Sequence, residues 1–578
     1  MIKRLLGCVR EYKKATILTP SYVAMEVVLE CILPFVMAKL INSIGTTKME
    51  PILYYGGILV VLAFASLFCG VMSAINAAIA SAGFAKNLRH DLFYKVQSFG
   101  FSDIDAFSVS SLVTRMTTDV TNVQNAFQMV IRIAVRTPLM LIFSVVMSML
   151  INVKMSLIFI GIIPVLGIVA FFLIRKVIGI FKRIFKKYDA MNNSVQENVA
   201  GIRVVKSFVR EDYEKKKFGA TAEEVRFDFT YAEKIIALNQ PIMMFCIYTA
   251  MLLVSFLGAK LIIASGGTVL STGELSSLIT YGIQILSSMM MLSMVFVMMS
   301  MAEESANRIS EVLDHESHLI SPENGKTEVA NGSIEFENVS FKYNEKSKKP
   351  ALSDITLSIP SGTTVGIIGG TGSSKTSLIQ LINRLYDVTE GSVKVGGVDV
   401  RDYDLESLRD AVSVVLQKNV LFSGTIKDNL RWGNPGASDE DMKRVCRLAQ
   451  AEEFIEQFPD GYDTVIERGG VNVSGGQKQR LCIARALLKK PKILILDDST
   501  SAVDTKTDAL IRSAFKKEIP ETTKLIIAQR VASVQDADMI LVMEGGMIAE
   551  QGTHEELLEK KGIYYEVFQS QTKGKEAV

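Results

Sequence analysis

The sequence predicts an α-helical membrane domain of six spans, followed by an α/β domain built around a phosphate-binding loop (P-loop). Long apolar runs occupy residues 1–310. Residues 363–377, TTVGIIGGTGSSKTS, have the pattern of a strand that leads into a glycine-rich loop and a helix. Residues 492–500, KILILDDST, have the pattern of a buried strand that ends in two carboxylates. We therefore expect a membrane domain at 1–310, a linker at 311–332 and an α/β domain at 333–578.

The membrane domain is predicted from hydropathy. Hydrophobic residues make up 49% of the chain, and the mean hydropathy is +0.28. Because the C-terminal part has the composition of an ordinary soluble α/β domain, the N-terminal half must raise this average. Six apolar runs are each long enough to cross a hydrocarbon core of about 30 Å. These runs lie near residues 16–44, 52–80, 128–151, 155–174, 238–264 and 275–302.

The loop charges predict the orientation. The long loops at about 81–125 and 175–237 carry nearly all the loop lysines and arginines, whereas the turns near 45–50, 152–154 and 265–274 are short and nearly uncharged. By the positive-inside rule, both long loops, both termini and the α/β domain are expected to be cytoplasmic, in a multi-pass protein of the cytoplasmic (plasma) membrane. The N-terminal segment MIKRLLGCVREYKK is basic and amphipathic, so we expect it to lie on the membrane rather than to be a cleavable signal peptide.

Net charge and cysteine usage point to no other class of partner. The formal net charge is only +2, so nothing indicates a nucleic-acid partner. The six cysteines show no CxxC spacing and lie mostly in apolar runs or in the C-terminal domain. We therefore predict that they are small apolar core residues.

The P-loop carries the phosphate chemistry. Its glycines let backbone N–H groups close around a pyrophosphate, Lys375 reaches the terminal phosphates, and the Thr376 hydroxyl can hold Mg²⁺. The pattern G-x-x-x-x-G-K-[ST] has glycine before the lysine, where this chain has Ser374. Taken alone, the motif is explained equally well by a glycine–serine turn without a ligand. The predicted nucleotide-binding residues here are Gly369, Gly370, Thr371, Gly372, Ser373, Ser374, Lys375, Thr376 and Ser377.

Three further motifs extend this site. Asp497 ends the strand ILILD and is placed to reach Mg²⁺ through water, although a buried strand with a polar end is the alternative. In NVSGGQKQR, residues 472–480, a serine and paired glycines before a helix offer backbone donors to an anion. In FENVSFKY, Tyr343 ends a strand where its ring could stack on adenine, and an ordinary surface tyrosine is the alternative.

Together these motifs resemble those of the ABC transporter family, specifically exporters whose membrane and nucleotide-binding domains are fused in one chain. The resemblance covers essentially the whole length. It implies ATP and Mg²⁺ as cofactors, with Tyr343 as the adenine-stacking aromatic. It also implies that Gln417 contacts Mg²⁺ and the membrane domain, so that the metal-site residues are Thr376, Gln417 and Asp497.

The resemblance assigns further segments. It identifies the residues of the family signature, which are Ser474, Gly475, Gly476 and Gln477. Glu467, Arg468 and Gly469 resemble the segment that touches the coupling helices, and Asp504 resembles the loop between the two ATP sites. The strings VSSLVTRMTTDVTNVQ and NVAGIRVVKSFVRED look like intracellular helical hairpins whose tips carry coupling helices, with solvated charged faces as the alternative for any single residue.

Two catalytic positions depart from the family pattern. Hydrolytic members have a glutamate after the strand aspartate, and this chain has Asp498. One methylene fewer withdraws the carboxylate by about 1.5 Å, and a misplacement of about 1 Å can lower a rate about 100-fold. Gln529 stands at the position of the switch histidine, and a neutral amide cannot take up or relay a proton. With Ser374, these changes resemble the degenerate member of a heterodimeric exporter.

The family's assembly makes such a member useful. Two nucleotide-binding domains dimerise head to tail, so each ATP lies between one chain's P-loop and the other chain's signature. This chain's own loop would then belong to the weak site, while its signature would complete the working site of a homologous half-transporter. The alternative is a non-hydrolytic regulatory or channel-like subunit in which ATP merely clamps the domains, and the intact signature favours the first hypothesis.

The substrate is predicted only by class. Glu26 and Glu30 lie four residues apart on one face of the first span, and a carboxylate inside the bilayer usually faces a cavity or a partner. They are the candidate substrate residues, and a structural pairing with a basic residue of another span is the alternative. The sixth run is rich in methionine, which suits either varied apolar ligands or helix packing. We expect export of small amphipathic or cationic drugs, with lipid or peptide export as the alternative.

Overall fold

The computed structural model describes residues 2–44, 49–317, 319–344, 347, 349–499 and 502–576. Residues 45–48 of the first predicted turn therefore lie outside the described residues. The chain divides into two compact units. The first comprises Met1–Ser98 and Ser108–His315, and the second comprises Phe99–Phe107 and Glu316–Val578.

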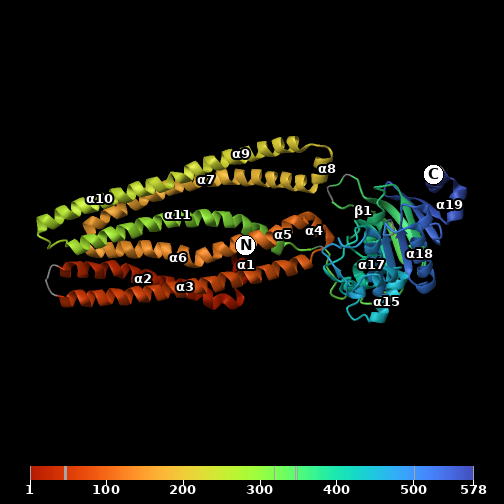
Figure 1. The fold of residues 1–578 in the computed structure, drawn as a ribbon, viewed down its shortest axis with the longest axis horizontal. Coiled ribbons are helices and arrows are strands. Elements are labelled where there is room, and N and C mark those ends of the chain that lie inside the picture. Colours follow the sequence, from red (N-terminus) through yellow and green to blue (C-terminus); the bar gives the residue numbers. More distant parts are fainter. Residues whose placement is uncertain are drawn as a thin grey trace. The chain divides into compact units, whose positions relative to one another are not determined.

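The first unit consists of helices. Its longest helices lie side by side, and α2 packs against both α3 and α6 (Figure 1). The short helix α8 connects the long helices α7 and α9. The helices of this unit are α1 (Ile2–Gly7), α2 (Lys13–Ile44), α3 (Met49–Gln97), α5 (Val109–Thr114), α6 (Val120–Ile151), α7 (Val153–Ala200), α8 (Ile202–Ser207), α9 (Glu211–Ala237), α10 (Asn239–Ser265) and α11 (Thr272–Asp314), with a 3-10 turn at Arg10–Tyr12 and a π-helical turn at Arg115–Asp119.

Capping side chains and a glycine mark where several of these helices begin and end. Asn152, between α6 and α7, has extended backbone, and its side chain accepts a hydrogen bond from the N–H of Met155. Gly266 ends α10 in the left-handed conformation that glycine adopts at little cost. Ser271 then begins α11 with a reciprocal capping box to Glu274. A short polar turn therefore joins each of these two helix pairs.

Four helical segments are long and apolar enough to cross a membrane: Met49–Gln97, Val109–Ile151, Glu211–Ser265 and Thr272–Asp314. Val153–Val169 is a shorter apolar helix, and α2 is not among the four. Within the described residues, these findings support a membrane-spanning unit. The count of six spans stays a prediction.

The second unit contains two main sheets. The larger has the strand order β12-β11-β3-β10-β9-β6, with β12 antiparallel and the other neighbouring pairs parallel. The smaller is antiparallel, with the order β2-β1-β4-β5. The strands are β1 (Ile334–Phe341), β2 (Leu352–Ile359), β3 (Thr364–Gly369), β4 (Glu390–Val395), β5 (Val398–Asp399), β6 (Val412–Val415), β7 (Gly424–Thr425), β8 (Val465–Ile466), β9 (Ile493–Asp497), β10 (Thr523–Ile527), β11 (Met539–Glu544) and β12 (Met547–Gly552).

Helices connect and cover these strands. The helices of the second unit are α4 (Phe101–Phe107), α12 (Lys375–Ile382), α13 (Leu405–Ala411), α14 (Ile426–Arg431), α15 (Asp439–Leu448), α16 (Glu452–Glu456), α17 (Gly475–Leu488), α18 (Thr505–Glu518), α19 (His554–Lys560) and α20 (Ile563–Glu576), with 3-10 turns at Val400–Asp402, Gly461–Asp463 and Val531–Ser533. Helix α4 belongs to this unit although it lies between α3 and α5 in sequence.

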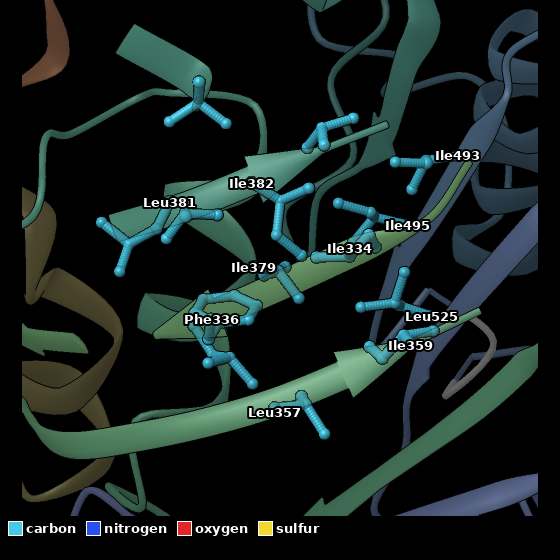
Figure 2. Close-up of a cluster of buried hydrophobic side chains, with 14 of the residues drawn as sticks. Ile334, Phe336, Leu357, Ile359, Ile379, Leu381, Ile382, Ile493, Ile495 and Leu525 are labelled. Carbon is cyan, nitrogen blue, oxygen red and sulfur yellow. The ribbon is translucent and has the colours of Figure 1, made fainter. Parts of the chain in front are cut away.

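One large hydrophobic cluster of the second unit lies between its two sheets and α12. Figure 2 shows side chains from β1, α12 and the large sheet, including Phe336, Ile379 and Ile495, gathered in one cluster. Strand β9 is buried along its whole length, which fits its nearly uninterrupted apolar sequence. All six cysteines are free thiols, and five are buried, in agreement with the predicted packing role. Because β3 and β9 are fixed in this core, the loops at their carboxyl ends have a rigid base.

Candidate nucleotide site

The P-loop joins β3, which lies between β11 and β10, to α12. A Cβ added at Gly370 or Gly372 would meet nothing within 4 Å, so the backbone at these positions is open to a ligand. Gly372 has φ +81°, which favours glycine. Ser374 also has a left-handed backbone, at φ +68° and ψ +25°. A residue with a Cβ pays roughly 1–2 kcal/mol there, so the loop keeps a glycine conformation while carrying a serine.

Lys375 is folded into this loop. Its Nζ donates hydrogen bonds to the carbonyl oxygens of Gly369 and Gly370, both at 2.8 Å, and to Ser373 Oγ at 3.1 Å. Burial lowers the pKa of Lys375, while the nearby Asp497 and Asp498 act in the opposite direction. The ammonium group therefore lies within the curve of the loop, where the P-loop pattern places it against terminal phosphates.

The side chains expected to hold Mg²⁺ meet beside the loop. Thr376 Oγ1 donates to Asp497 at 3.0 Å to Oδ2 and 3.3 Å to Oδ1. Asp497 is buried, and this burial raises its pKa while the Thr376 hydrogen bond opposes the shift. In the described part of the chain no cluster of three His, Cys, Asp or Glu residues could hold a metal. A hydroxyl and a carboxylate side by side fit a hard cation whose remaining ligands are water and phosphate oxygens.

The two departures from the family pattern are in direct contact. Gln529 Nε2 donates to Asp498 Oδ2 at 2.8 Å, and Gln417 Nε2 approaches the same oxygen at 3.4 Å. A carboxylate oxygen accepts and an amide NH₂ donates, so this contact fixes which end of each amide faces Asp498. Asp498 has φ +47°, and its N–H donates to the Ile527 carbonyl at 3.0 Å. The carboxylate is therefore held by amides at the edge of the sheet.

Tyr343 is tied to the helix that follows the P-loop. Its hydroxyl bonds Ser377 Oγ at 2.8 Å and donates to Gln380 Oε1 at 2.9 Å. Its ring is half-exposed, at 49%, and lies edge-on to Phe341 and Tyr386 at centroid distances of 4.8 and 5.1 Å. The structure thus brings the predicted adenine-stacking residue to the start of α12.

Residues of helix α4 and Tyr386 pack near the predicted adenine position, although no sequence motif singled them out. The Tyr386 hydroxyl donates to Asp105 Oδ2 at 2.7 Å, and the Tyr386 ring lies 6.2 Å from that of Phe101. Burial, together with the Asp105 carboxylate, raises the pKa of Tyr386. Since Tyr386 also packs on Tyr343, a row of neighbouring aromatic rings connects α4 to the predicted adenine position. Tyr386 lies in the ordinary sequence NRLYDV, which offers no signal of this role.

The signature begins helix α17. Ser474 Oγ accepts from the N–H of Gln477 at 3.3 Å, and Gln477 Oε1 accepts from the N–H of Ser474 at 2.9 Å. This capping box leaves the N–H groups of Gly475 and Gly476 at the open end of a 14-residue helix. A Cβ at Gly476 would lie 2.9 Å from the Ala502 carbonyl, so glycine is required there. In the described residues, no hydrogen bond of this signature reaches the P-loop.

The neighbouring predicted segments have structural contacts. The Gly469 N–H donates to the Leu421 carbonyl at 3.2 Å, and Lys478 Nζ donates to the Gly469 carbonyl at 2.7 Å. Asp504 caps α18 by accepting from the N–H of Thr507 at 3.0 Å. These bonds fix the segment before the signature helix and the start of α18. They leave the partner contacts predicted for Glu467, Arg468, Gly469 and Asp504 untested.

In the first unit, Arg136 of α6 lies between Glu26 and Glu30 of α2. Its Nη1 donates to Glu26 Oε1 at 2.5 Å, and its Nη2 donates to the two oxygens of Glu30 at 2.8 and 2.7 Å. The pairing with a basic residue of another helix, weighed as the alternative to substrate binding, is therefore present. Within this triad one negative charge remains, and Glu26 Oε2 is buried without a hydrogen-bond partner in the described structure.

The intracellular strings also make contacts inside the first unit. Arg115 pairs with Glu311 at 2.7 Å, and Asp119 accepts hydrogen bonds from Ser305 and Arg308 at 2.9 and 2.5 Å. The turn Arg115–Asp119 is thereby fixed to α11. In the other string, Lys206 of α8 pairs with Glu211 at the start of α9, at 3.0 Å.

A strand–P-loop–helix site in one unit, with a helical membrane-type unit in the same chain, defines a P-loop ATPase fused to a membrane domain. Comparison with known proteins agrees. Residues 21–289 match the family described as ABC transporter transmembrane region, and residues 352–501 match the family described as ABC transporter. The chain is 35% identical over 549 residues to the uncharacterized ABC transporter ATP-binding protein YfiB of Bacillus subtilis (strain 168), with 94% of each chain covered.

Two further similarities extend over nearly the whole chain. An uncharacterized ABC transporter ATP-binding protein, Rv1273c of Mycobacterium tuberculosis (strain ATCC 25618 / H37Rv), is 31% identical over 571 residues, covering 98% of this chain and 97% of its own length. A solved structure described as a bacterial Atm1-family ABC exporter with ATP bound shares the fold, with a TM-score of 0.83 at 24% identity, covering 97% of this chain and 98% of the other. The chain belongs to the ABC transporter family, with its membrane and ATP-binding domains fused.

Proposed function

We propose that this chain is one half of a heterodimeric, ATP-driven exporter, in which its own P-loop forms a degenerate ATP site and its signature completes the hydrolytic site of a homologous partner. The hydrogen bond of 2.8 Å between Gln529 and Asp498 carries this proposal, because it joins the two residues that replace the water-activating glutamate and the switch histidine. Because the two side chains touch, we interpret the two departures as coupled rather than as two unrelated substitutions.

The chemistry of this pair supports slow hydrolysis. Activation of water requires a carboxylate close to the attacking oxygen, and Asp498 both has a shorter side chain and is held by two amides. Gln529 can donate a hydrogen bond to a phosphate oxygen but cannot accept and return a proton near neutral pH. The P-loop, Thr376 and Asp497 retain the groups that bind nucleotide and Mg²⁺. The site thus favours ATP binding without efficient turnover.

The signature supports a role in a second site. Ser474 and Gln477 form a complete capping box, and the glycines after Ser474 leave N–H groups at a helix N-terminus, where anions are stabilised. A subunit that only bound ATP at its own P-loop would not need an intact signature that can bind a second phosphate group. We infer that the partner's ATP is the ligand of the signature.

The triad supports a class of substrate. Two carboxylates and one guanidinium leave a negative charge at Glu26, Glu30 and Arg136, and such a charge in a membrane attracts a cation. We propose small amphipathic molecules, cationic ones in particular, as the exported substrates. In this proposal the protein lies in the cytoplasmic membrane with its ATP-binding unit in the cytoplasm, as the lysines and arginines of the long loops predict.

The substrate proposal is tested by Glu30→Gln. This variant leaves Arg136 paired with Glu26, so it removes the surplus charge without leaving the guanidinium unpaired. We expect efflux of cationic dyes to fall about fivefold, the effect of losing roughly 1 kcal/mol from a partly exposed charge interaction, while basal ATP hydrolysis is unchanged. Glu50→Gln, at the start of α3, is the matched control. Equal efflux by both variants would leave the triad a structural feature only.

The main test is ATP turnover by the purified full-length chain without a partner. We expect binding of a fluorescent ATP analogue in the presence of Mg²⁺, with hydrolysis far below the usual enzyme range of about 1–1,000 per second. Turnover of several per second by the chain alone would refute the degenerate-site proposal. Binding without turnover in any complex, including one with a co-purifying homologue, would instead favour a regulatory subunit.

A further inference from the structure

The C-terminal helix α20 reaches the loop that carries Gln529. Gln571 Nε2 donates to the Gln529 carbonyl at 2.8 Å, and Gln571 Oε1 accepts from the N–H of Val531 at 2.9 Å. A backbone carbonyl only accepts and a backbone N–H only donates, so both ends of the amide are matched. One side chain therefore bridges two backbone groups on either side of Arg530.

Helix α20 is firmly attached to the second unit. At its start, the Glu550 carboxylate accepts hydrogen bonds from the N–H groups of Ile563 and Tyr564 at 2.6 and 3.1 Å. One turn before Gln571, Phe568 packs on an apolar cluster that includes Val531. Since the helix is fixed at its N-terminus and along its apolar face, Gln571 projects from a rigid support rather than from a free tail.

The loop held by Gln571 leads directly to the altered catalytic pair. The backbone of Gln529 accepts the Gln571 hydrogen bond, while the side chain of Gln529 donates to Asp498 at 2.8 Å. A shift of the Gln529 backbone moves the amide that holds the Asp498 carboxylate. Asp498 follows Asp497, which bonds Thr376 beside the P-loop. A continuous series of contacts thus runs from α20 to the predicted phosphate and Mg²⁺ position.

We propose that Gln571 is a positioning residue of the ATP site: its amide fixes the backbone of the Gln529 loop and thereby the placement of the Gln529 side chain at the phosphate end of the nucleotide. This inference rests on the proposed function for the identity of the ligand, ATP. It assigns to the C-terminal helix a role in nucleotide affinity that no motif of the sequence indicates.

Gln571→Ala and Gln569→Ala make a matched pair for the test. Gln569 is the same residue type in the same helix, but its amide donates to Tyr565 of the same helix. Hydrogen–deuterium exchange of the full-length chain measures the hydrogen bond from the Val531 N–H to Gln571 directly, because this N–H loses its acceptor only in Gln571→Ala. We expect faster exchange in a peptide spanning 529–534 for Gln571→Ala, and wild-type exchange there for Gln569→Ala.

The functional measurement is the affinity of the full-length chain for a fluorescent ATP analogue with Mg²⁺. We expect Gln571→Ala to weaken binding about fivefold, as for the loss of roughly one net hydrogen bond. Gln571→Glu, which accepts from Val531 but cannot donate to the Gln529 carbonyl, should weaken binding as well. Equal affinities for Gln571→Ala, Gln569→Ala and wild type would overturn the proposal, as would a lowered thermal midpoint with unchanged affinity.

Failure of this inference is distinct from failure of the proposed function. Rapid ATP hydrolysis by the chain alone would refute the degenerate site, yet the bridge made by Gln571 would still predict weaker binding of the ATP analogue in Gln571→Ala. Conversely, a chain that does not hydrolyse ATP, and that binds the analogue equally well as Gln571→Ala and as wild type, would refute the positioning role of Gln571. The degenerate-site proposal would then still stand.

Discussion

Two serines at helix N-termini, one in the P-loop and one in the signature, differ in their backbone conformation and in their capping hydrogen bonds. Ser374 precedes α12 in the left-handed conformation, at φ +68°, and makes no capping hydrogen bond with its side chain. Ser474 precedes α17 with extended backbone, at φ −68° and ψ +159°, and forms a complete capping box with Gln477. The same residue type is strained in the chain's own P-loop and well accommodated in its signature.

This difference extends to the chemistry around each serine. Lys375, the residue after Ser374, interacts electrostatically with Asp498, whose carboxylate accepts a hydrogen bond from Gln529. Beside Ser474 the glycines remain, and Gly476 packs closely on the Ala502 carbonyl. Under the proposed function, the departures from the family pattern lie in the P-loop site, whereas the signature keeps its serine, glycines and glutamine.

The largest expected effect comes from restoring the altered pair. Asp498→Glu together with Gln529→His lengthens the carboxylate and supplies an imidazole that exchanges protons near neutral pH. We expect ATP hydrolysis by the chain alone to rise about 100-fold over the wild type, the factor associated with correcting a misplacement of about 1 Å. Each single change should give a smaller gain. An unchanged rate in the double variant, with binding intact, would contradict the comparison.

A smaller effect is expected from Ser374→Gly. Removing the Cβ relieves roughly 1 kcal/mol of backbone strain, which corresponds to a rise of about 2 °C in the thermal midpoint for a unit of this size. Ser373→Gly is the control, since its backbone lacks a positive φ and its hydroxyl accepts from Lys375 at 3.1 Å. A thermal midpoint lowered equally by both changes would mean that Ser374 is not strained.

The features that could be located from the sequence are those with a pattern of neighbouring residues. The strand, glycine-rich loop and helix at β3 and α12 follow from residues adjacent in the chain, and so does Asp497 at the end of β9. The family resemblance named Asp498 and Gln529 as departures, although it could not show that their side chains touch. Motif and hydropathy patterns therefore predicted a helical membrane domain followed by an ABC-type domain, while the six spans and the roles of the site residues stay predictions.

Contacts between distant, common residues were not predictable in the same way. The Tyr386–Asp105 bond joins residues 281 positions apart, and Gln571 lies 42 positions after Gln529. No periodicity or motif marks such a pair, because each arises from the packing of whole elements. Helix α4 illustrates the same point: its sequence lies among membrane helices, but its contacts belong to the ATP-binding unit. The basic partner of Glu26 and Glu30 was anticipated as a type, and Arg136 emerged only from the packing of α2 on α6.

The central proposal, that this chain's P-loop and signature serve different ATP sites, is tested most directly in a complex with a homologous half-transporter, once one has been co-purified with the full-length chain. Lys375→Ala removes a charge from the weak site, so steady-state ATP hydrolysis should persist at a reduced rate. Ser474→Ala with Gly475→Glu removes a donor and places a carboxylate against the phosphates of the partner's ATP, so hydrolysis should nearly vanish. Both variants must first be shown to co-purify equally with the partner. If Lys375→Ala were the more damaging change, the chain's own site would be the hydrolytic one, and the account would be wrong.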